Sequence, residues 1–145
     1  DGAEASLQRS FDELAHGATV FREPILVNDR EVLVRARTDD VLWCDFHELC
    51  EKPRSAHDYI ELAREYHTVL LSKVPQMGET QDNAVRRFIN LIDEFYDRQV
   101  KVIISAEAPI AEIYRGGRLN FEIRRTQSRL QEMQSLEYLQ LPHLP

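Results

Sequence analysis

The chain has 145 residues, a formal net charge of −7 and 43% hydrophobic residues, a composition that fits one globular domain with its own core. Uninterrupted apolar runs such as residues 69–71 and 102–104 are far shorter than the ~20 residues that a membrane-spanning helix needs, so we expect no membrane span. The acidic balance also argues against nucleic-acid binding, because Lys and Arg supply most of the affinity for phosphates.

The N-terminal third is expected to form a helix followed by short strands. Apolar residues at helical spacing predict the helix over residues 4–15, and Gly17 ends it. Two apolar triplets around a polar turn predict a β-hairpin, and a third short strand follows. These three strands are expected at residues 25–27, 32–34 and 41–43. We therefore interpret residues 1–44 as a helix and hairpin placed before the main fold.

The centre of the chain has the most regular pattern. Ser55 and Asp58 form a capping-box pair that predicts a helix over residues 56–66. Two continuous apolar runs then predict buried strands, and the segment between them has apolar residues at helical spacing. These elements are expected at residues 67–72, 80–98 and 100–105. Such a strand, helix and strand indicate a parallel βαβ unit with a right-handed crossover, so the predicted fold class is α/β.

The C-terminal part is expected to add three further elements. A short helix is predicted at residues 109–114, a strand at 119–123 because apolar and polar residues alternate there, and a last helix at 126–134. No repeat or linker divides the chain, so we predict a single domain with its α/β core at residues 45–139 and a tail at 140–145.

The sequence contains no G-x-x-x-x-G-K-[ST] phosphate loop, and its glycine pair, Gly116–Gly117, follows a predicted helix rather than a strand. Residues 88–94 imitate the acidic end of a Walker B strand, where carboxylates hold magnesium and polarise water. We reject this interpretation, because the apolar residues of the segment repeat at helical spacing and a strand already follows at Val100. No cofactor site is therefore expected in this chain.

A zinc site is the weakest of the hypotheses that the sequence raises. Cys44, His47 and Cys50 form a C-x2-H-x2-C pattern, and His57 follows as a candidate fourth ligand. The pattern is incomplete, and free cysteines beside aromatic residues such as Trp43 are common in protein cores. We therefore assign no metal ligand, and the small number of cysteines favours a reduced, intracellular setting.

An arginine cluster is the most distinctive functional feature. Residues 115–129 contain five arginines and one acid, Glu122. On the last predicted helix, Arg125 and Arg129 lie one turn apart and present two guanidinium groups to an anion or to a neighbouring subunit. The plainer alternative is that both arginines form ordinary ion pairs, with Glu122 and Glu132 within reach.

Several segments together resemble the C-terminal part of the ZapE family, AAA-type ATPases linked to bacterial cell division. The matching segments are DFHELC at 45–50, PRSAHDY at 53–59, YHTVLLSKVPQM at 66–77, RRFINLIDEFYD at 86–97, SA at 105–106 and RTQSRLQEMQS at 125–135. In that family the Walker A and Walker B segments precede the matched region. The resemblance thus implies a C-terminal fragment of a longer ATPase, whose preceding part binds ATP and magnesium. The βαβ unit is also similar in layout to half of a P-loop AAA module, although Ser105–Ala106 stands where a sensor asparagine is expected.

The resemblance supports two functional hypotheses. The first is a C-terminal domain that is inactive alone, assembles with the N-terminal ATPase part or as a homo-oligomer, and offers Arg125 or Arg129 to phosphates bound elsewhere. The second is a non-catalytic module that docks a division protein such as FtsZ through its acidic N-terminal helix and hairpin. Both imply a bacterial cytoplasmic location, and the second implies contact with the inner face of the membrane through the partner.

Overall fold

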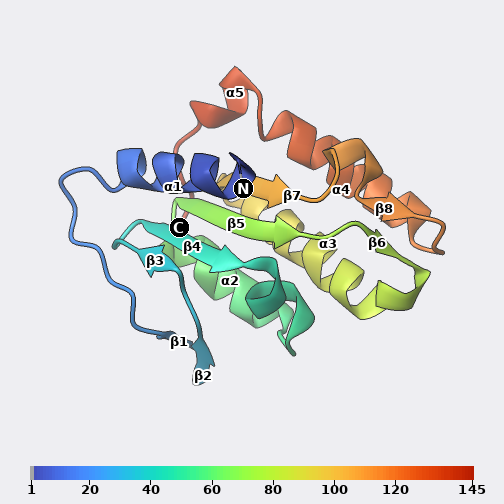
Figure 1. Cartoon of the computed structure of the whole chain (residues 1–145), viewed down its shortest axis with the longest axis horizontal. Coiled ribbons are helices and arrows are strands. Elements are labelled where there is room, and N and C mark those ends of the chain that lie inside the picture. Colours follow the sequence, from blue (N-terminus) through green and yellow to red (C-terminus); the bar gives the residue numbers. More distant parts are fainter. Residues whose placement is uncertain (1) are drawn as a thin grey trace.

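The computed structural model describes residues 2–145 and contains a four-stranded sheet in the order β3-β4-β5-β7 (Figure 1). These strands are β3 (Ala36–Arg37), β4 (Val41–Asp45), β5 (Thr68–Val74) and β7 (Lys101–Ala106). The last three run parallel to one another, and β3 pairs antiparallel with β4 at one edge. The predicted α/β class is therefore confirmed.

Two consecutive βαβ units build the parallel part of this sheet. The helix α2 (Ala56–Glu65) connects β4 to β5, and α3 (Asp82–Asp97) connects β5 to β7. The second unit is the predicted one. The first was not expected, because residues 41–43 were assigned to the N-terminal strands, whereas β4 pairs along its whole length with β5. Four consecutive buried residues in β4 are typical of a strand covered on both faces.

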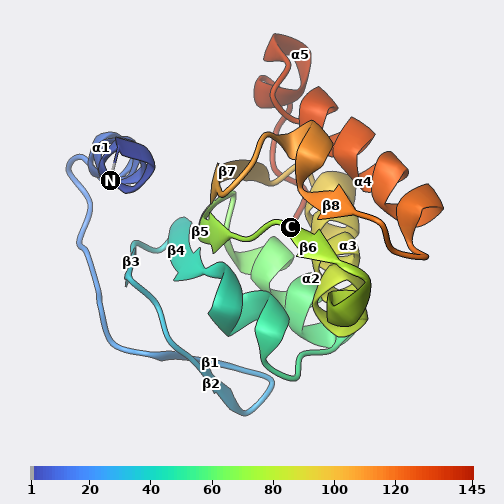
Figure 2. The ribbon, with the colours of Figure 1, turned by 45° about the vertical axis from the view of Figure 1, so that its right-hand side comes forward.

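Helices cover both faces of the sheet. Figure 2 shows α1 (Gly2–Leu14) alone on one face, while α2 and α3 lie together on the other. Leu7 and Phe11 are the buried residues of α1, and they pack in one apolar cluster with Trp43 and Leu70 of the sheet. Phe11 and Trp43 have ring centroids 5.6 Å apart. The N-terminal helix is thus an integral layer of the fold.

Local sequence signals set the bounds of the two central helices. The backbone N–H of Ser55 donates to Asp58 Oδ2 over 3.0 Å, which confirms the predicted capping box at the start of α2. A single π-helical turn, η1 (His47–Glu51), precedes it, and a 3-10 turn, η2 (Glu79–Gln81), leads into α3. The helix α3 buries six apolar side chains against the core.

The predicted strand at residues 119–123 is wrong, because this segment opens the helix α4 (Asn120–Glu132). The buried residues of α4 are Ile123, Thr126 and Leu130, which follow helical spacing. Phe121 belongs to the apparent alternation, yet it is 85% exposed. The predicted last helix at 126–134 is therefore the second part of a longer helix that starts earlier.

The predicted short helix at residues 109–114 is also wrong in type. A 3-10 turn, η3 (Ile110–Glu112), leads into the short strand β8 (Tyr114–Arg115), which pairs in parallel with β6 (Met77–Gly78). This small parallel pair was not predicted, since strands of two residues leave no periodic signal in the sequence.

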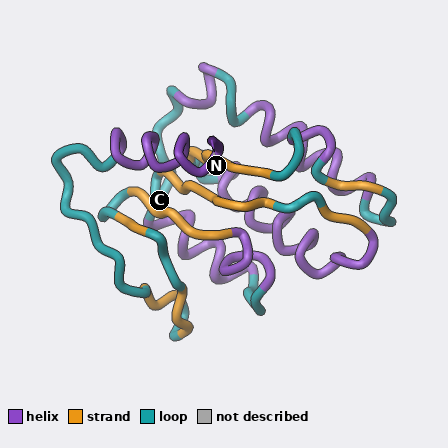
Figure 3. The backbone as a smooth tube through the Cα atoms, in the orientation of Figure 1, coloured by secondary structure: helices purple, strands orange, loops and turns teal. Residues whose placement is uncertain are grey.

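The hairpin and the C-terminal end complete the chain (Figure 3). The hairpin consists of β1 (Ile25–Val27) and β2 (Arg30–Val32), joined through Asn28 and Asp29 with φ of 51° and 68°. Positive φ at both positions is typical of the two-residue hairpin turn, which Asn and Asp tolerate. The short helix α5 (Leu136–Leu139) follows α4. Among residues 2–145, no helix is long and apolar enough to cross a bilayer.

Candidate functional site

The arginines of residues 115–129 do not converge on one site. Arg115 and Arg118 lie before α4, where Arg115 is 4.0 Å from Glu112 and Arg118 donates to Asp82 over 2.7 Å. More than 70% of each of these two arginine side chains is exposed. Exposed pairs of this kind contribute at most about 1 kcal/mol each, so neither arginine is held rigidly toward a common ligand.

Arg125 and Arg129 lie one turn apart on α4, and both contact Asp93 on α3. Arg129 Nη1 donates to Asp93 Oδ1, and Arg125 Nη2 lies 3.4 Å from Oδ2 of the same carboxylate. The Arg129 guanidinium also lies over the Tyr96 ring, 4.9 Å from its centroid. The side chain of Arg129 is 24% exposed and that of Arg125 is 66% exposed. Arg129 therefore fastens α4 to α3, while most of Arg125 stays accessible.

The expected acidic partners of these arginines were wrong. Glu122 is exposed, and Glu132 accepts a hydrogen bond of 2.8 Å from the Tyr96 hydroxyl. Asp93 takes their place, and it belongs to the segment that imitates a Walker B strand. That segment lies within α3, as its helical spacing predicted, and Asp93 is a counter-ion of two arginines there.

The candidate zinc ligands do not gather around a common point. Cys44 and Cys50 are free and fully buried, and burial raises the pKa of both thiols well above the ordinary value. The His47 side chain is 69% exposed and lies 3.4 Å from Glu51. Within residues 2–145, no three His, Cys, Asp or Glu side chains are grouped as a metal site.

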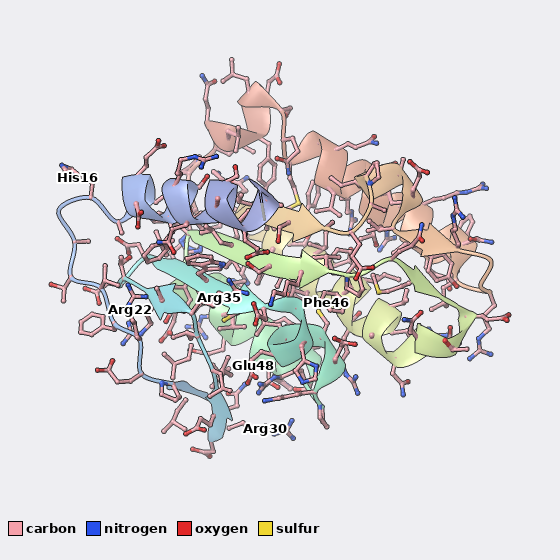
Figure 4. All side chains as sticks on the ribbon, in the orientation of Figure 1. His16, Arg22, Arg30, Arg35, Phe46 and Glu48 are labelled. Atoms are coloured by element: carbon pink, nitrogen blue, oxygen red, sulfur yellow. The ribbon has the colours of Figure 1, made fainter. Side chains whose placement is uncertain are left out.

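A polar cluster that was not predicted from the sequence lies at the carboxyl ends of β5 and β7. Glu4 of α1 reaches this edge and accepts hydrogen bonds from Ser105 Oγ over 2.6 Å and from Ser72 Oγ over 3.0 Å. Arg35 Nη1 is 3.0 Å from Glu4 Oε2, and Arg35 Nε is 2.7 Å from Asp45 Oδ1. Figure 4 labels Arg35 beside β4. In parallel sheets this edge is the usual place for ligands.

The electrostatics of this edge favour an anion. Burial opposes ionisation of Glu4, but hydrogen bonds from Ser105 and Ser72 and the charges of Arg35 and Lys73 outweigh it and lower the pKa of the carboxyl group. A cavity of about 320 Å³ opens next to the Glu4 carboxylate. Its lining residues are Ala3, Glu4, Lys73, Ser105, Ala106 and Glu107.

Part of this cluster had a signal in the sequence. Ser72 and Ser105 stand at the ends of two predicted parallel strands, so the fold class alone places them at one edge of the sheet. Glu4 and Arg35 come from other segments: Glu4 lies 101 positions before Ser105 and 31 positions before Arg35. No spacing in the sequence connects them, because only the packing of α1 on the sheet brings them together.

The chain matches one protein family and several known proteins. The model of the AFG1-like ATPase family matches residues 1–142. The chain is 44% identical over 144 residues to the cell division protein ZapE of Escherichia coli K12, a match that covers 99% of this chain and 38% of that protein. It is 35% identical over 133 residues to lactation elevated protein 1 homolog B of Danio rerio, covering 90% of this chain and 26% of that protein. No solved structure matches the chain.

Proposed function

The chain belongs to the AFG1-like ATPase family, and from this premise we propose that it is the C-terminal domain of an ATP-hydrolysing protein whose other part binds ATP and magnesium. The observation that carries the proposal is the family match over residues 1–142 in a sequence that contains no phosphate-binding loop. The chain spans about two fifths of the E. coli relative, 38% of its length. In this proposal the domain supports assembly of the ATPase and does not hydrolyse ATP alone.

The proposed contribution to the reaction is an arginine supplied to phosphates bound elsewhere, in another part or subunit of a homo-oligomer. Arg125 is the better candidate, because its side chain is 66% exposed and its contact with Asp93 is 3.4 Å long. Arg129 is less accessible and stacks on Tyr96, so it would position α4 rather than touch the nucleotide. Arginines that stabilise a phosphoryl-transfer transition state are worth roughly 10³–10⁵ in turnover.

The test measures ATP turnover and oligomeric state of the full-length protein that carries this domain. We expect Arg125→Ala to lower turnover by roughly 10³ or more with unchanged assembly. The matched control is Arg124→Ala, since Arg124 is an exposed neighbour on the same helix, and its turnover should stay near wild type. Normal turnover of Arg125→Ala would refute the proposed role of Arg125 in the reaction. The thermal stability of the Arg129→Ala variant tests whether Arg129 attaches α4 to α3.

The isolated chain provides a second test. We expect no ATP hydrolysis and no nucleotide affinity tighter than about 1 mM, because a helix terminus without a phosphate loop binds anions weakly. Isothermal titration calorimetry with ATP and magnesium measures this directly. Micromolar binding by the isolated chain would contradict the proposal that another part of the protein binds ATP.

A second candidate function is docking of a division protein such as FtsZ, in the bacterial cytoplasm and at the inner face of the membrane. The observation that favours it is Leu26, which is 75% exposed on the hairpin, in the acidic N-terminal part. A pull-down of FtsZ with the isolated chain tests this, with Leu26→Ser as the variant and Phe121→Ser, 85% exposed on α4, as the control. Binding that depends on Leu26 and not on Phe121 is expected, and no binding refutes docking by this domain.

A further inference from the structure

Within residues 2–145, the side chains of Ser72, Ser105 and Arg35 donate hydrogen bonds to the Glu4 carboxylate at the carboxyl ends of β5 and β7. Ser105 Oγ donates to Oε1, while Ser72 Oγ and Arg35 Nη1 donate to Oε2, over 2.6, 3.0 and 3.0 Å respectively. We call the three donor groups of Ser72, Ser105 and Arg35 the anion cradle. Charge-assisted hydrogen bonds such as these are stronger than bonds between neutral groups.

The hydroxyl protons of the cradle are held in the donating direction. The Trp43 indole Nε1–H donates to Ser72 Oγ over 2.8 Å, and the backbone N–H of Lys73 donates to Ser105 Oγ over 2.9 Å. A hydroxyl carries a single proton, so a hydroxyl oxygen that already accepts one N–H offers that proton to the group opposite. Ser72 and Ser105 are 0% and 4% exposed, and water therefore competes little for these protons.

Arg35 of the cradle and the neighbouring Lys73 are also fixed by their surroundings. Arg35 is held by Asp45 through Nε over 2.7 Å and lies over the Trp43 ring, 5.4 Å from its centroid. Lys73 has a positive φ of 62° where the register of β5 shifts against β7. This conformation is unfavourable for a residue with a side chain. In it, the backbone N–H of Lys73 forms its hydrogen bond to Ser105 Oγ.

The cradle is therefore a preorganised site for an anion. Its two hydroxyl donors are buried and oriented, its third donor, Arg35, is positive and 29% exposed, and all three lie at the edge of a parallel sheet where ligands commonly bind. Glu4 belongs to the first turn of α1, whereas the apolar anchors Leu7 and Phe11 come later in the helix. The first turn can thus unwind while the rest of α1 remains packed, since helix ends fray at low cost.

We propose that the cradle is a binding site for the carboxylate or phosphate group of a ligand, and that Glu4 occupies it as an intramolecular competitor. The cavity of about 320 Å³ beside Glu4 gives room for the remainder of such a ligand. Unwinding of the first turn of α1 withdraws Glu4 and opens the cradle. This site is separate from Arg125 on α4, so the test of the cradle is independent of the proposed ATPase role.

The experiment uses the complete chain and its single tryptophan, Trp43, whose indole N–H donates to Ser72 and gives one resonance in a ¹H–¹⁵N spectrum. Inorganic phosphate and acetate are titrated separately at constant ionic strength into wild type and Glu4→Ala. We expect a saturable shift of this resonance in Glu4→Ala, with an affinity at least about tenfold tighter than in wild type, because the competitor is gone. The two ions distinguish a phosphate ligand from a carboxylate ligand.

Two controls define the site. Glu13→Ala removes an exposed acid from the same helix and should behave like wild type. Adding Ser105→Ala to Glu4→Ala should abolish the saturable shift. If Glu4→Ala lowers the stability of the fold, Glu4→Gln retains the volume of the side chain and should give an affinity between those of wild type and Glu4→Ala.

Two results would overturn the proposal. One is a folded Glu4→Ala chain that shows no saturable shift up to about 100 mM of either ion, a hundred times a millimolar dissociation constant. The other is an equal shift in wild type, Glu4→Ala and the double variant, which would show that the ions bind elsewhere.

Discussion

The Glu48→Ala substitution would remove a carboxylate that three groups share in the turn η1 after β4 (labelled in Figure 4). Glu48 Oε2 accepts hydrogen bonds from Arg54 Nη2 over 2.9 Å and from the Leu33 backbone N–H over 3.0 Å, and Oε1 is 2.6 Å from Lys52 Nζ. The side chains of Glu48 and Arg54 are only 6% and 4% exposed. The substitution would therefore leave a buried guanidinium without its counter-ion.

The magnitude follows from the burial of each partner. Breaking a buried ion pair on one side costs about 3–5 kcal/mol, because the remaining charge is uncompensated. Lys52 is 40% exposed and adds less than about 1 kcal/mol, since water replaces the carboxylate. At about 2–4 °C per kcal/mol for a chain of this size, we expect the melting temperature to fall by roughly 6–20 °C.

Urea unfolding and thermal melting at pH 7, followed by circular dichroism, measure this loss. The matched control is Glu51→Ala in the same turn, because the Glu51 side chain is 42% exposed and pairs with the exposed His47. That control should cost less than about 1 kcal/mol, and Glu48→Gln should lie between the two. If Glu48→Ala were as stable as Glu51→Ala, the buried ion pair would not support this turn and the reasoning would be wrong.

Three further predictions test other parts of the fold. Gly117→Ala should cost about 1–3 kcal/mol in urea unfolding, because its Cβ would lie 1.8 Å from the hydroxyl oxygen of the buried Tyr114; no measurable loss would show that the ring moves freely. Phe11→Ala should cost about 3–5 kcal/mol or release α1, which hydrogen exchange of the helix amides detects; unchanged protection and stability would contradict the packing of α1. The pKa values of Glu4 and Glu48 lie below the ordinary 4.5. Both carboxylates therefore stabilise the fold above that pH, and this contribution is lost as the pH falls through their folded pKa values. Melting temperatures should decline below about pH 4.5, and they should decline less steeply in the double variant Glu4→Gln, Glu48→Gln.

The central part of the fold was accessible from the sequence because its signals are local. The pair Ser55 and Asp58 specifies the start of α2 within four residues, and the apolar runs at 69–71 and 102–104 specify two strands. Of these, β5 is buried as predicted, whereas β7 lies at the edge of the sheet and is only partly buried. A strand, helix and strand in that order leave one common arrangement, the right-handed parallel crossover. The same reasoning placed Arg125 and Arg129 one turn apart, as the structure shows.

Errors arose where one pattern fits two structures. Leu119, Phe121 and Ile123 alternate as in a strand, yet Leu119 and Ile123 also stand four positions apart, as on a helix, and are buried while Phe121 is exposed. The choice between the two periods depends on which side chains find a core, and a short window of sequence does not contain that information. The strand β4 was predicted at residues 41–43, but its parallel pairing with β5 was not, because β5 lies beyond α2 in the chain.

The α/β class, the capped helix, the central crossover and the family of the chain all follow from its residue pattern. The pairing of Asp93 with Arg125 and Arg129, and the meeting of Glu4 with Ser72, Ser105 and Arg35, depend on how the elements pack. The difference lies in the sequence separation over which each interaction acts. Periodicity and capping act between residues a few positions apart, whereas ion pairs and hydrogen bonds between distant segments form only after the sheet and its two helical layers have packed.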